Sequence, residues 1–159
     1  MKLLKFISLL FIFFLTSFKA FGAVSGFVDS KQVNQNIPMA IAFNPSGTKM
    51  FVVGMSQNKI FEFDLTTGFD VSTATKNSNV CSFIGLADDA VDIDFNSDGT
   101  KLFLVDQDQG DDDEHAVDEF SLSTAYDVST CTHVEEHYTD DFKLVGIEFN
   151  PGGTKLFIY

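Results

Sequence analysis

The sequence has no arginine and no tryptophan, and it contains only three prolines, two cysteines and ten lysines, against 23 acidic residues. Its formal net charge is −13 at pH 7. Without arginine there is no planar guanidinium group to bind a phosphate through two hydrogen bonds, and the excess of acids repels polyanions. We therefore expect no nucleic acid partner and no binding to an anionic membrane surface.

After residue 22 the sequence also lacks long apolar runs and any stretch with the periodicity of an amphipathic helix. Before that point, Lys2 and Lys5 precede an apolar run over residues 6–18, and small residues then lead up to Ala23. This order is typical of a secretory signal peptide, and the run is shorter than the roughly 20 residues of a spanning helix. We predict a signal peptide over residues 1–22, no membrane span after its cleavage, and a secreted, periplasmic or cell-surface protein.

One ten-residue phrase occurs three times. Residues 44–53 read Asn-Pro-Ser-Gly-Thr-Lys-Met-Phe-Val-Val, and related phrases begin at Asn96 and Asn150, at spacings of 52 and 54 residues. A second phrase that ends in Asp-Val-Ser-Thr occupies residues 62–73 and 119–130. Repeats of about 40–50 residues built from short strands are characteristic of β-propeller blades, which bury their apolar faces only by stacking.

Each repeat has the pattern of four strands. Val91, Ile93 and Phe95 alternate with acidic residues, as in a strand with two different faces. The Asn-to-Gly segment after this strand, and its counterparts in the other repeats, has the composition of a tight turn. The expected strands are 39–43, 49–54, 59–65 and a fourth within 76–84; then 91–95, 101–106, 117–122 and 131–138; then 145–149 and 155–159. The sequence predicts an all-β fold, a β-propeller with four-stranded antiparallel blades.

The repeats also predict the organisation of the chain. Residues 39–88 form blade 1, residues 89–143 form blade 2, and residues 144–159 begin a third. Residues 23–38 are predicted to contribute an outer strand that closes the ring, and we expect Phe69 and Tyr126 to fill the space between blades. Because two blades and the start of a third do not close a ring, we expect the sequence to be a fragment of a larger protein.

Taken together, the Phe-Asn-Pro-Ser-Gly-Thr-Lys phrase at residues 43–49 and the Phe-Asp-Val-Ser-Thr-Ala phrase at residues 69–74 resemble the repeats of secreted bacterial β-propeller proteins. The resemblance covers nearly all of residues 25–159 and extends to the lactonase-type propellers with Tyr-Val-Thr-Asn repeats. Since the shared motif is itself structural, the resemblance implies a fold and assigns no catalytic residue.

The two cysteines, Cys81 and Cys131, are predicted on the outer strands of neighbouring blades. An oxidising compartment permits a disulfide, but outer strands diverge in a propeller, and a bridge needs Cα atoms within about 7 Å. We favour two separate thiols that pack as small apolar groups, with the disulfide as the alternative.

The acidic insertion at residues 106–114 is the first candidate site. Asp106, Asp108 and Asp112 could supply oxygen ligands to calcium, with Gly110 among them. The spacing is not that of an EF-hand loop, so we expect a site no tighter than about 10⁻⁴ M. The alternative is a solvated acidic loop that discourages aggregation at the sheet edge. We predict no other cofactor.

A second candidate is the set of carboxylates expected on the first strands, Asp92, Asp94 and Glu148, which could line a central channel. The alternative is that they contact channel water or lysines of the next strand. The histidines predict no zinc site, because His133 and His137 are about 13 Å apart in an extended strand.

Two functions remain. The first, which we favour, is a non-catalytic secreted repeat protein that binds a protein or glycan ligand. The alternative is a hydrolase of the lactonase type with its site in the central channel of the complete ring. A propeller is a platform for many activities, so the fold does not decide between them.

Overall fold

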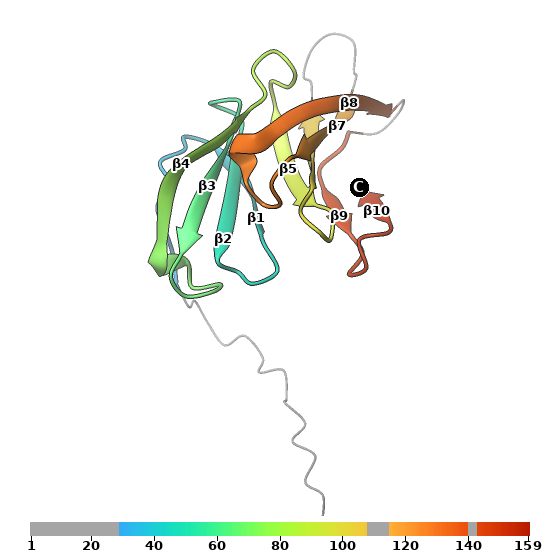
Figure 1. The fold of residues 1–159 in the computed structure, drawn as a ribbon. Helices are drawn as coiled ribbons and strands as arrows, with labels where there is room; N and C mark the ends of the chain where they lie inside the picture. The colour runs from blue at the N-terminus through green and yellow to red at the C-terminus, as the bar shows by residue number, and fades with distance from the viewer. Residues whose placement is uncertain (1–28, 108–114, 140–142) are drawn as a thin grey trace, which may run out of the picture.

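The computed structural model describes residues 29–107, 115–139 and 143–159 (Figure 1). The predicted signal peptide and its cleavage site lie outside these residues. The described part is all-β, and it contains no helix of the length and hydrophobicity needed to cross a bilayer. Its strands are β1 Pro38–Phe43, β2 Lys49–Gly54, β3 Lys59–Leu65 and β4 Ala74–Ser82; β5 Ala90–Phe95, β6 Lys101–Gln107, β7 His115–Leu122 and β8 Cys131–Thr139; and β9 Ile147–Phe149 with β10 Leu156–Ile158.

These strands form two four-stranded antiparallel sheets, in the orders β1-β2-β3-β4 and β5-β6-β7-β8, followed by the β9–β10 hairpin. We call them the first sheet, the second sheet and the C-terminal hairpin. A one-turn 3₁₀ helix precedes the outer strand of each sheet, η1 at Val71–Thr73 and η2 at Val128–Thr130. The all-β prediction and the four-strand repeat are confirmed, and the arrangement is consistent with propeller blades. The described strands form no closed ring.

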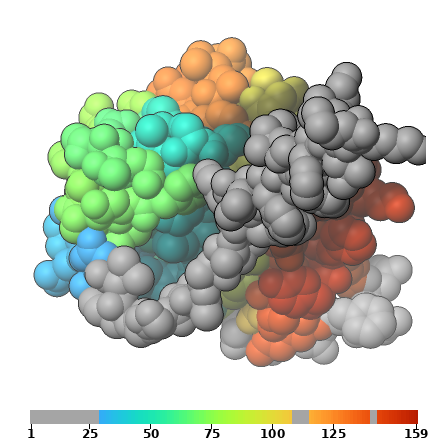
Figure 2. Space-filling view, turned by 90° about the horizontal axis from the view of Figure 1, so that it is seen from below, coloured from blue at the N-terminus to red at the C-terminus, as the bar shows by residue number. Residues whose placement is uncertain are grey.

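An apolar core joins the two sheets. Alternation along the strands directs one set of side chains of each sheet into this interface. Phe51 of β2 meets Phe95 of β5 with ring centroids 4.5 Å apart, and Phe120 of β7 is buried in the same core. A second core, which includes Val105 and Ile147, joins the second sheet to the C-terminal hairpin. In the space-filling view the first sheet (blue to green) and the C-terminal hairpin (red) lie on opposite sides of the molecule (Figure 2).

The opposite face of the first sheet has a core of its own, which includes Phe63 and Leu65. Val33 packs against it, and Gln35 donates a hydrogen bond to the carbonyl of Gly54. Residues 29–37 form no strand. Residues 23–28 lie outside the described part, so the ring-closing strand stays a prediction.

The two aromatic residues of the Asp-Val-Ser-Thr phrases differ in their environment. Tyr126 packs against Phe95 in the core between the sheets, with ring centroids 5.3 Å apart, as expected for a residue that fills this space. Phe69 was expected to do the same, but its side chain is 61% exposed. The reason is that Phe69 packs against Phe43, whose side chain belongs to the core on the opposite face of the first sheet.

The preference for two separate thiols is wrong, because Cys81 and Cys131 form a disulfide with their Cα atoms 5.8 Å apart. The outer strands do not diverge where β8 begins. There the amide of Asn79 on β4 donates to Asp127, and the backbone N–H of Val128 donates to the Glu62 carboxylate of β3. These bonds hold η2 and the start of β8 against β4.

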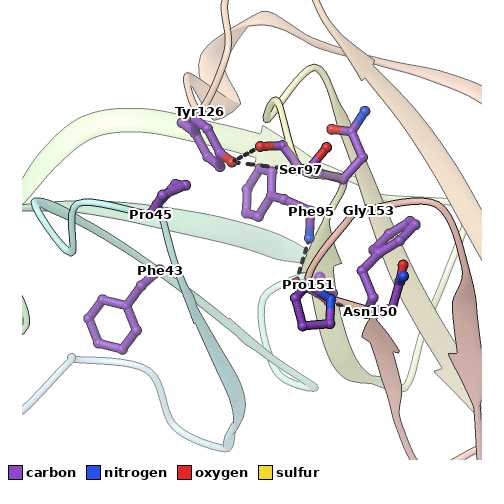
Figure 3. A pocket seen from close by; sticks show the side chains of 11 residues that line it. Phe43, Pro45, Phe95, Ser97, Tyr126, Asn150, Pro151 and Gly153 are labelled. Carbon is purple, nitrogen blue, oxygen red and sulfur yellow. Dashed lines mark hydrogen bonds between the residues drawn. The ribbon is translucent and has the colours of Figure 1, made fainter. Parts of the chain in front are cut away.

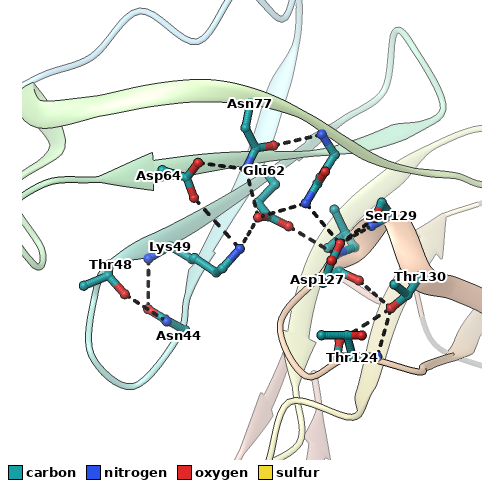
Figure 4. Close-up of polar contacts among 12 residues, drawn as sticks. Asn44, Thr48, Lys49, Glu62, Asp64, Asn77, Thr124, Asp127, Ser129 and Thr130 are labelled. Atoms are coloured by element: carbon teal, nitrogen blue, oxygen red, sulfur yellow. Dashed lines mark hydrogen bonds and ion pairs between the residues drawn. The ribbon is translucent and has the colours of Figure 1, made fainter.

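Glu62 is the centre of this contact between the sheets (Figure 4). Its side chain is fully buried, and one carboxylate oxygen is paired with the ammonium group of Lys49 and accepts from Asn77 at 2.9 Å. The other oxygen accepts the backbone N–H of Val128 at 3.2 Å. Burying a carboxylate is costly unless it is paired and hydrogen-bonded, and both conditions are met here. The bond to Val128 therefore ties the position of the second sheet to a residue inside the first.

Candidate functional site

The turn between the first and second strands of each repeat has the same internal hydrogen bonds. In the second repeat, the backbone N–H of Gly99 donates to the carbonyl of Asn96, and the Asn96 side chain accepts from the backbone N–H of Lys101. Gly99 has a φ of 71°, and a Cβ there would lie 2.2 Å from the Tyr126 ring. Only glycine fits this backbone conformation and this close approach.

A cavity of about 250 Å³ lies where these turns meet (Figure 3). The lining residues include aromatic residues and prolines, Phe43, Phe95, Tyr126, Phe149, Pro45 and Pro151, but the rings of Phe43 and Phe149 pack in other cores, against Phe69 and Phe103. The polar part of the wall consists of Asp94, Asn96, Ser97 and Asn150, together with Gly153. Phe43, Phe95 and Phe149 hold the same position in three successive repeats, so the repeat itself builds the site. We call this cavity the turn pocket.

Acidic groups determine the electrostatics of the turn pocket. The hydroxyl group of Tyr126 donates to the carbonyl oxygen of Ser97 at 3.2 Å. Burial raises the pKa of Tyr126, and the negative charges of Asp98 and Asp94 raise it further. Of the residues that line the pocket, Asp94 is the only one with a carboxyl group, and none of them is a lysine or histidine. The pocket therefore places the hydrogen-bonding groups of Asn96, Ser97 and Asn150 beside the Tyr126 ring.

The carboxylates predicted on the first strands have a structural role. Asp92 accepts the backbone N–H groups of Ile93 and Ile147, both at 2.9 Å, and Asp94 accepts those of Phe95 and Phe149, both at 2.8 Å. The two aspartates thereby link β5 to β9 of the next repeat. Burial raises the pKa of Asp92 in spite of these bonds. Glu148 is exposed on β9 and is not among the lining residues of the turn pocket.

The acidic insertion is described only at its edge. Asp106 is buried at the end of β6 and accepts the backbone N–H of Asp89 at 2.9 Å. Asp108 and Asp112 lie outside the described residues. The calcium site at Asp106, Asp108 and Asp112 therefore stays a prediction.

The histidines of β8 contact different carboxylates. His133 lies 2.7 Å from the fully buried Asp118, and His137 lies 3.4 Å from Glu135 and 4.0 Å from Glu119. Ligand atoms of Glu119, Glu135 and His137 lie within 4.8 Å of one another, the one such group found in the described ranges. The sequence analysis missed it because its members become neighbours only through the pairing of β7 with β8. Lys101 already pairs with Glu119 at 2.6 Å, and Glu135 and His137 are exposed, so this group carries no metal assignment.

Asp118 predicts a pH dependence of stability. Burial raises its pKa from 3.8 to about 6, the hydrogen bond from His133 opposes this, and Glu136 and Asp106 add to it. The folded protein therefore binds a proton at Asp118 more tightly than the unfolded chain does. This contribution to stability is complete below pH 3.8 and is lost as the pH rises through about 6.

We expect the free energy of unfolding of the wild type, relative to that of Asp118→Asn, to increase between pH 7 and pH 5. Urea unfolding of both proteins at each pH measures the difference. Because all other titrating groups are the same in both proteins, the difference between the two free energies of unfolding reports on Asp118. If the difference is constant with pH, Asp118 does not titrate in this range.

No protein-family model matches the chain, and no curated protein matches it. Among solved structures, the chain is similar to the crystal structure of a "putative 6-phosphogluconolactonase" from Bacteroides fragilis, with a TM-score of 0.57 and 17% sequence identity over 76% of this chain. The chain spans 31% of the length of that protein. At this level of identity the similarity supports the all-β fold of antiparallel four-stranded sheets, consistent with propeller blades, and not the activity.

Proposed function

We propose that the chain is part of a secreted, non-catalytic β-propeller repeat protein that binds a ligand in the turn pocket. The pocket carries this proposal, because the turns of three repeats meet there and bring polar side chains and two prolines beside the Tyr126 ring. Ligand sites combine apolar walls with a few well-placed polar groups in the same way. A binding role requires no nucleophile, base or metal ion from the chain.

The alternative, a hydrolase of the lactonase type, draws support from the structural neighbour alone. A hydrolase needs a nucleophile, a base or a metal ion. The carboxylates of Asp92 and Asp94 are candidates for these roles, but each of their four oxygens already accepts a backbone N–H group. Within residues 29–107, 115–139 and 143–159, no hydroxyl group forms a hydrogen bond with a histidine ring. These observations favour binding over hydrolysis.

We expect Tyr126→Ala to weaken ligand binding about tenfold, because the ring forms part of the pocket wall and contributes about 1–2 kcal/mol through stacking or cation–π contact. The measurement is binding of the protein to immobilised oligosaccharides and short peptides. Phe69→Ala is the matched control, since Phe69 holds the same position in the first repeat and does not line the pocket. Equal binding by both variants, or 6-phosphogluconolactone hydrolysis by the wild type above the buffer rate, would contradict the proposal.

A further inference from the structure

We propose that Glu119, Glu135 and His137 form a docking surface for the 3₁₀ turn of a third blade, and that this turn has asparagine at its N-cap position, where η1 and η2 have aspartate. We call this surface the Glu119 face. The proposal rests on the propeller architecture of the proposed function, in which the C-terminal hairpin is the inner half of the third blade. It adds the chemistry of the segment that fits beside that hairpin.

The first observation is how η2 is held against the first sheet (Figure 4). The Glu62 carboxylate accepts the backbone N–H of Val128 at 3.2 Å, and the Asn79 amide donates to Asp127 at 3.0 Å. The disulfide from Cys81 fixes the residue that follows the turn. Three side chains of one sheet therefore hold the turn of the next sheet, through a carboxylate, an amide and a sulfur atom.

The second observation is that strand pairing gives each of these three positions a counterpart in the second sheet. Cys81 of β4 lies directly opposite Ile60 of β3. His137 of β8 lies directly opposite Val117 of β7, which holds the position of Ile60 in the second repeat. The counterparts are therefore Glu62 and Glu119, Asn79 and Glu135, and Cys81 and His137.

The Glu119 face is open in the part of the chain that the structure describes. One oxygen of Glu119 is paired with Lys101 at 2.6 Å. The other lies 4.0 Å from His137 and accepts no backbone N–H group from residues 29–107, 115–139 or 143–159. The side chains of Glu135 and His137 are 59% and 51% exposed, whereas Cys81, the counterpart of His137, is fully buried. The positions that hold a turn in the first sheet are therefore available for a turn in the second.

The third observation is the charge of the Glu119 face. Asn79 donates an N–H group to Asp127, but the carboxylate of its counterpart Glu135 has only acceptor oxygens. An aspartate at the N-cap of the docked turn would be repelled by Glu135 and Glu119. A second copy of this chain fits poorly for the same reason, because both of its turns have aspartate there, Asp70 in η1 and Asp127 in η2.

The capping requirement narrows the choice to asparagine. The Asp127 side chain accepts the backbone N–H of Ser129 at 3.0 Å, and Asp70 accepts that of Ser72 at 3.1 Å. Lysine and arginine have no acceptor, so they could pair with Glu135 but could not cap the turn. Asparagine caps as well as aspartate does, and its NH₂ group can donate to a carboxylate. The amide and the carboxylate thus exchange sides between the first contact and the second.

The disulfide of the first contact supplies the test. The full chain with His137→Cys is incubated in a glutathione redox buffer with a blocked peptide of the sequence of residues 124–132, or with the same peptide carrying Asp127→Asn. Mass spectrometry measures the fraction of protein joined to each peptide. We expect the asparagine peptide to be captured about fivefold more than the aspartate peptide, as for one exposed charge interaction.

Two neighbouring glutamates of β8 provide matched variants in the His137→Cys protein. Glu135 lies opposite Glu119, and Glu136 lies opposite Asp118, so their side chains are on different faces of the sheet. We expect Glu135→Asn, which restores the residue type of the first sheet, to reverse the preference in favour of the aspartate peptide. We expect Glu136→Asn, which removes the same charge, to leave the preference for asparagine unchanged.

Three results would overturn the proposal. The first is capture of either peptide no greater than that of a scrambled peptide with one cysteine. The second is equal capture of the two peptides, or a preference that Glu135→Asn does not change. The third is a dimer of the wild-type chain that Glu135→Lys disrupts, which would assign the Glu119 face to a second copy.

A second measurement covers the case in which His137→Cys does not fold. The wild-type protein is titrated with both peptides, each with its cysteine changed to serine, and the backbone amide signal of His137 is followed by NMR. A larger shift with the asparagine peptide is expected, and equal shifts or none would contradict the proposal. Tyr126→Ala, which tests the turn pocket, should leave both measurements unchanged, so the binding function and the docking surface can fail separately.

Discussion

Replacement of Glu62 by alanine is expected to lower the free energy of unfolding by about 3 kcal/mol. The carboxylate is fully buried and pairs with Lys49, and it also accepts the backbone N–H of Val128 in the second sheet. The substitution leaves Lys49 without its main partner and Val128 with an unpaired N–H in the interface. Because the Lys49 side chain is 29% exposed and can be partly rehydrated, we place the loss at the lower end of the range for broken buried ion pairs.

Glu119→Ala is the matched control for this prediction. Glu119 is the counterpart of Glu62 in the second repeat, and its partner Lys101 has a side chain that is 49% exposed. We expect a loss of about 1 kcal/mol or less, as for a pair near the surface. Urea unfolding of the two variants measures both values. Equal losses would show that the bond from Val128 to Glu62 adds nothing to the contact between the sheets.

The second large effect is expected from the disulfide. The bridge joins residues 50 apart in the sequence, and the entropy of closing a loop of that size in the unfolded chain corresponds to about 4 kcal/mol. We expect unfolding in the presence of dithiothreitol to occur at a clearly lower urea concentration than without it. The Cys81→Ala, Cys131→Ala double variant should resemble the reduced protein and should not respond to the reductant. Free thiols in the native protein would contradict the bridge.

The strands could be predicted from the sequence because their signals are local. The alternation around Ile93 and the asparagine-to-glycine turns lie within a few residues of the elements they specify. The expected strands 49–54 and 59–65 coincide with β2 and β3.

The disulfide and the exposure of Phe69 could not be predicted in this way. Both depend on how one repeat packs on another. The bond from Val128 to Glu62 holds the start of β8 against β4, and it joins residues 66 apart in the sequence.

The candidate site was missed for a related reason. The turns were interpreted as structural, and their glycines and asparagines are indeed accounted for by the turn geometry. The pocket arises only when the turns that follow Phe43, Phe95 and Phe149 come together from three repeats. Asp92 and Asp94 of β5 were predicted as candidates for function. No pattern in the sequence indicates that backbone N–H groups of β9 donate to both carboxylates.

An NMR titration of the ¹⁵N-labelled protein with an oligosaccharide or peptide that binds it tests the turn pocket most directly. We predict saturable shifts in the backbone amide signals of Ser97, Tyr126 and Asn150, which line the pocket, and none at His137, beside Glu119 and Glu135. We also predict that the shifts disappear in Tyr126→Ala. Shifts confined to the surroundings of His137, or no shifts at millimolar ligand, would contradict ligand binding in the turn pocket.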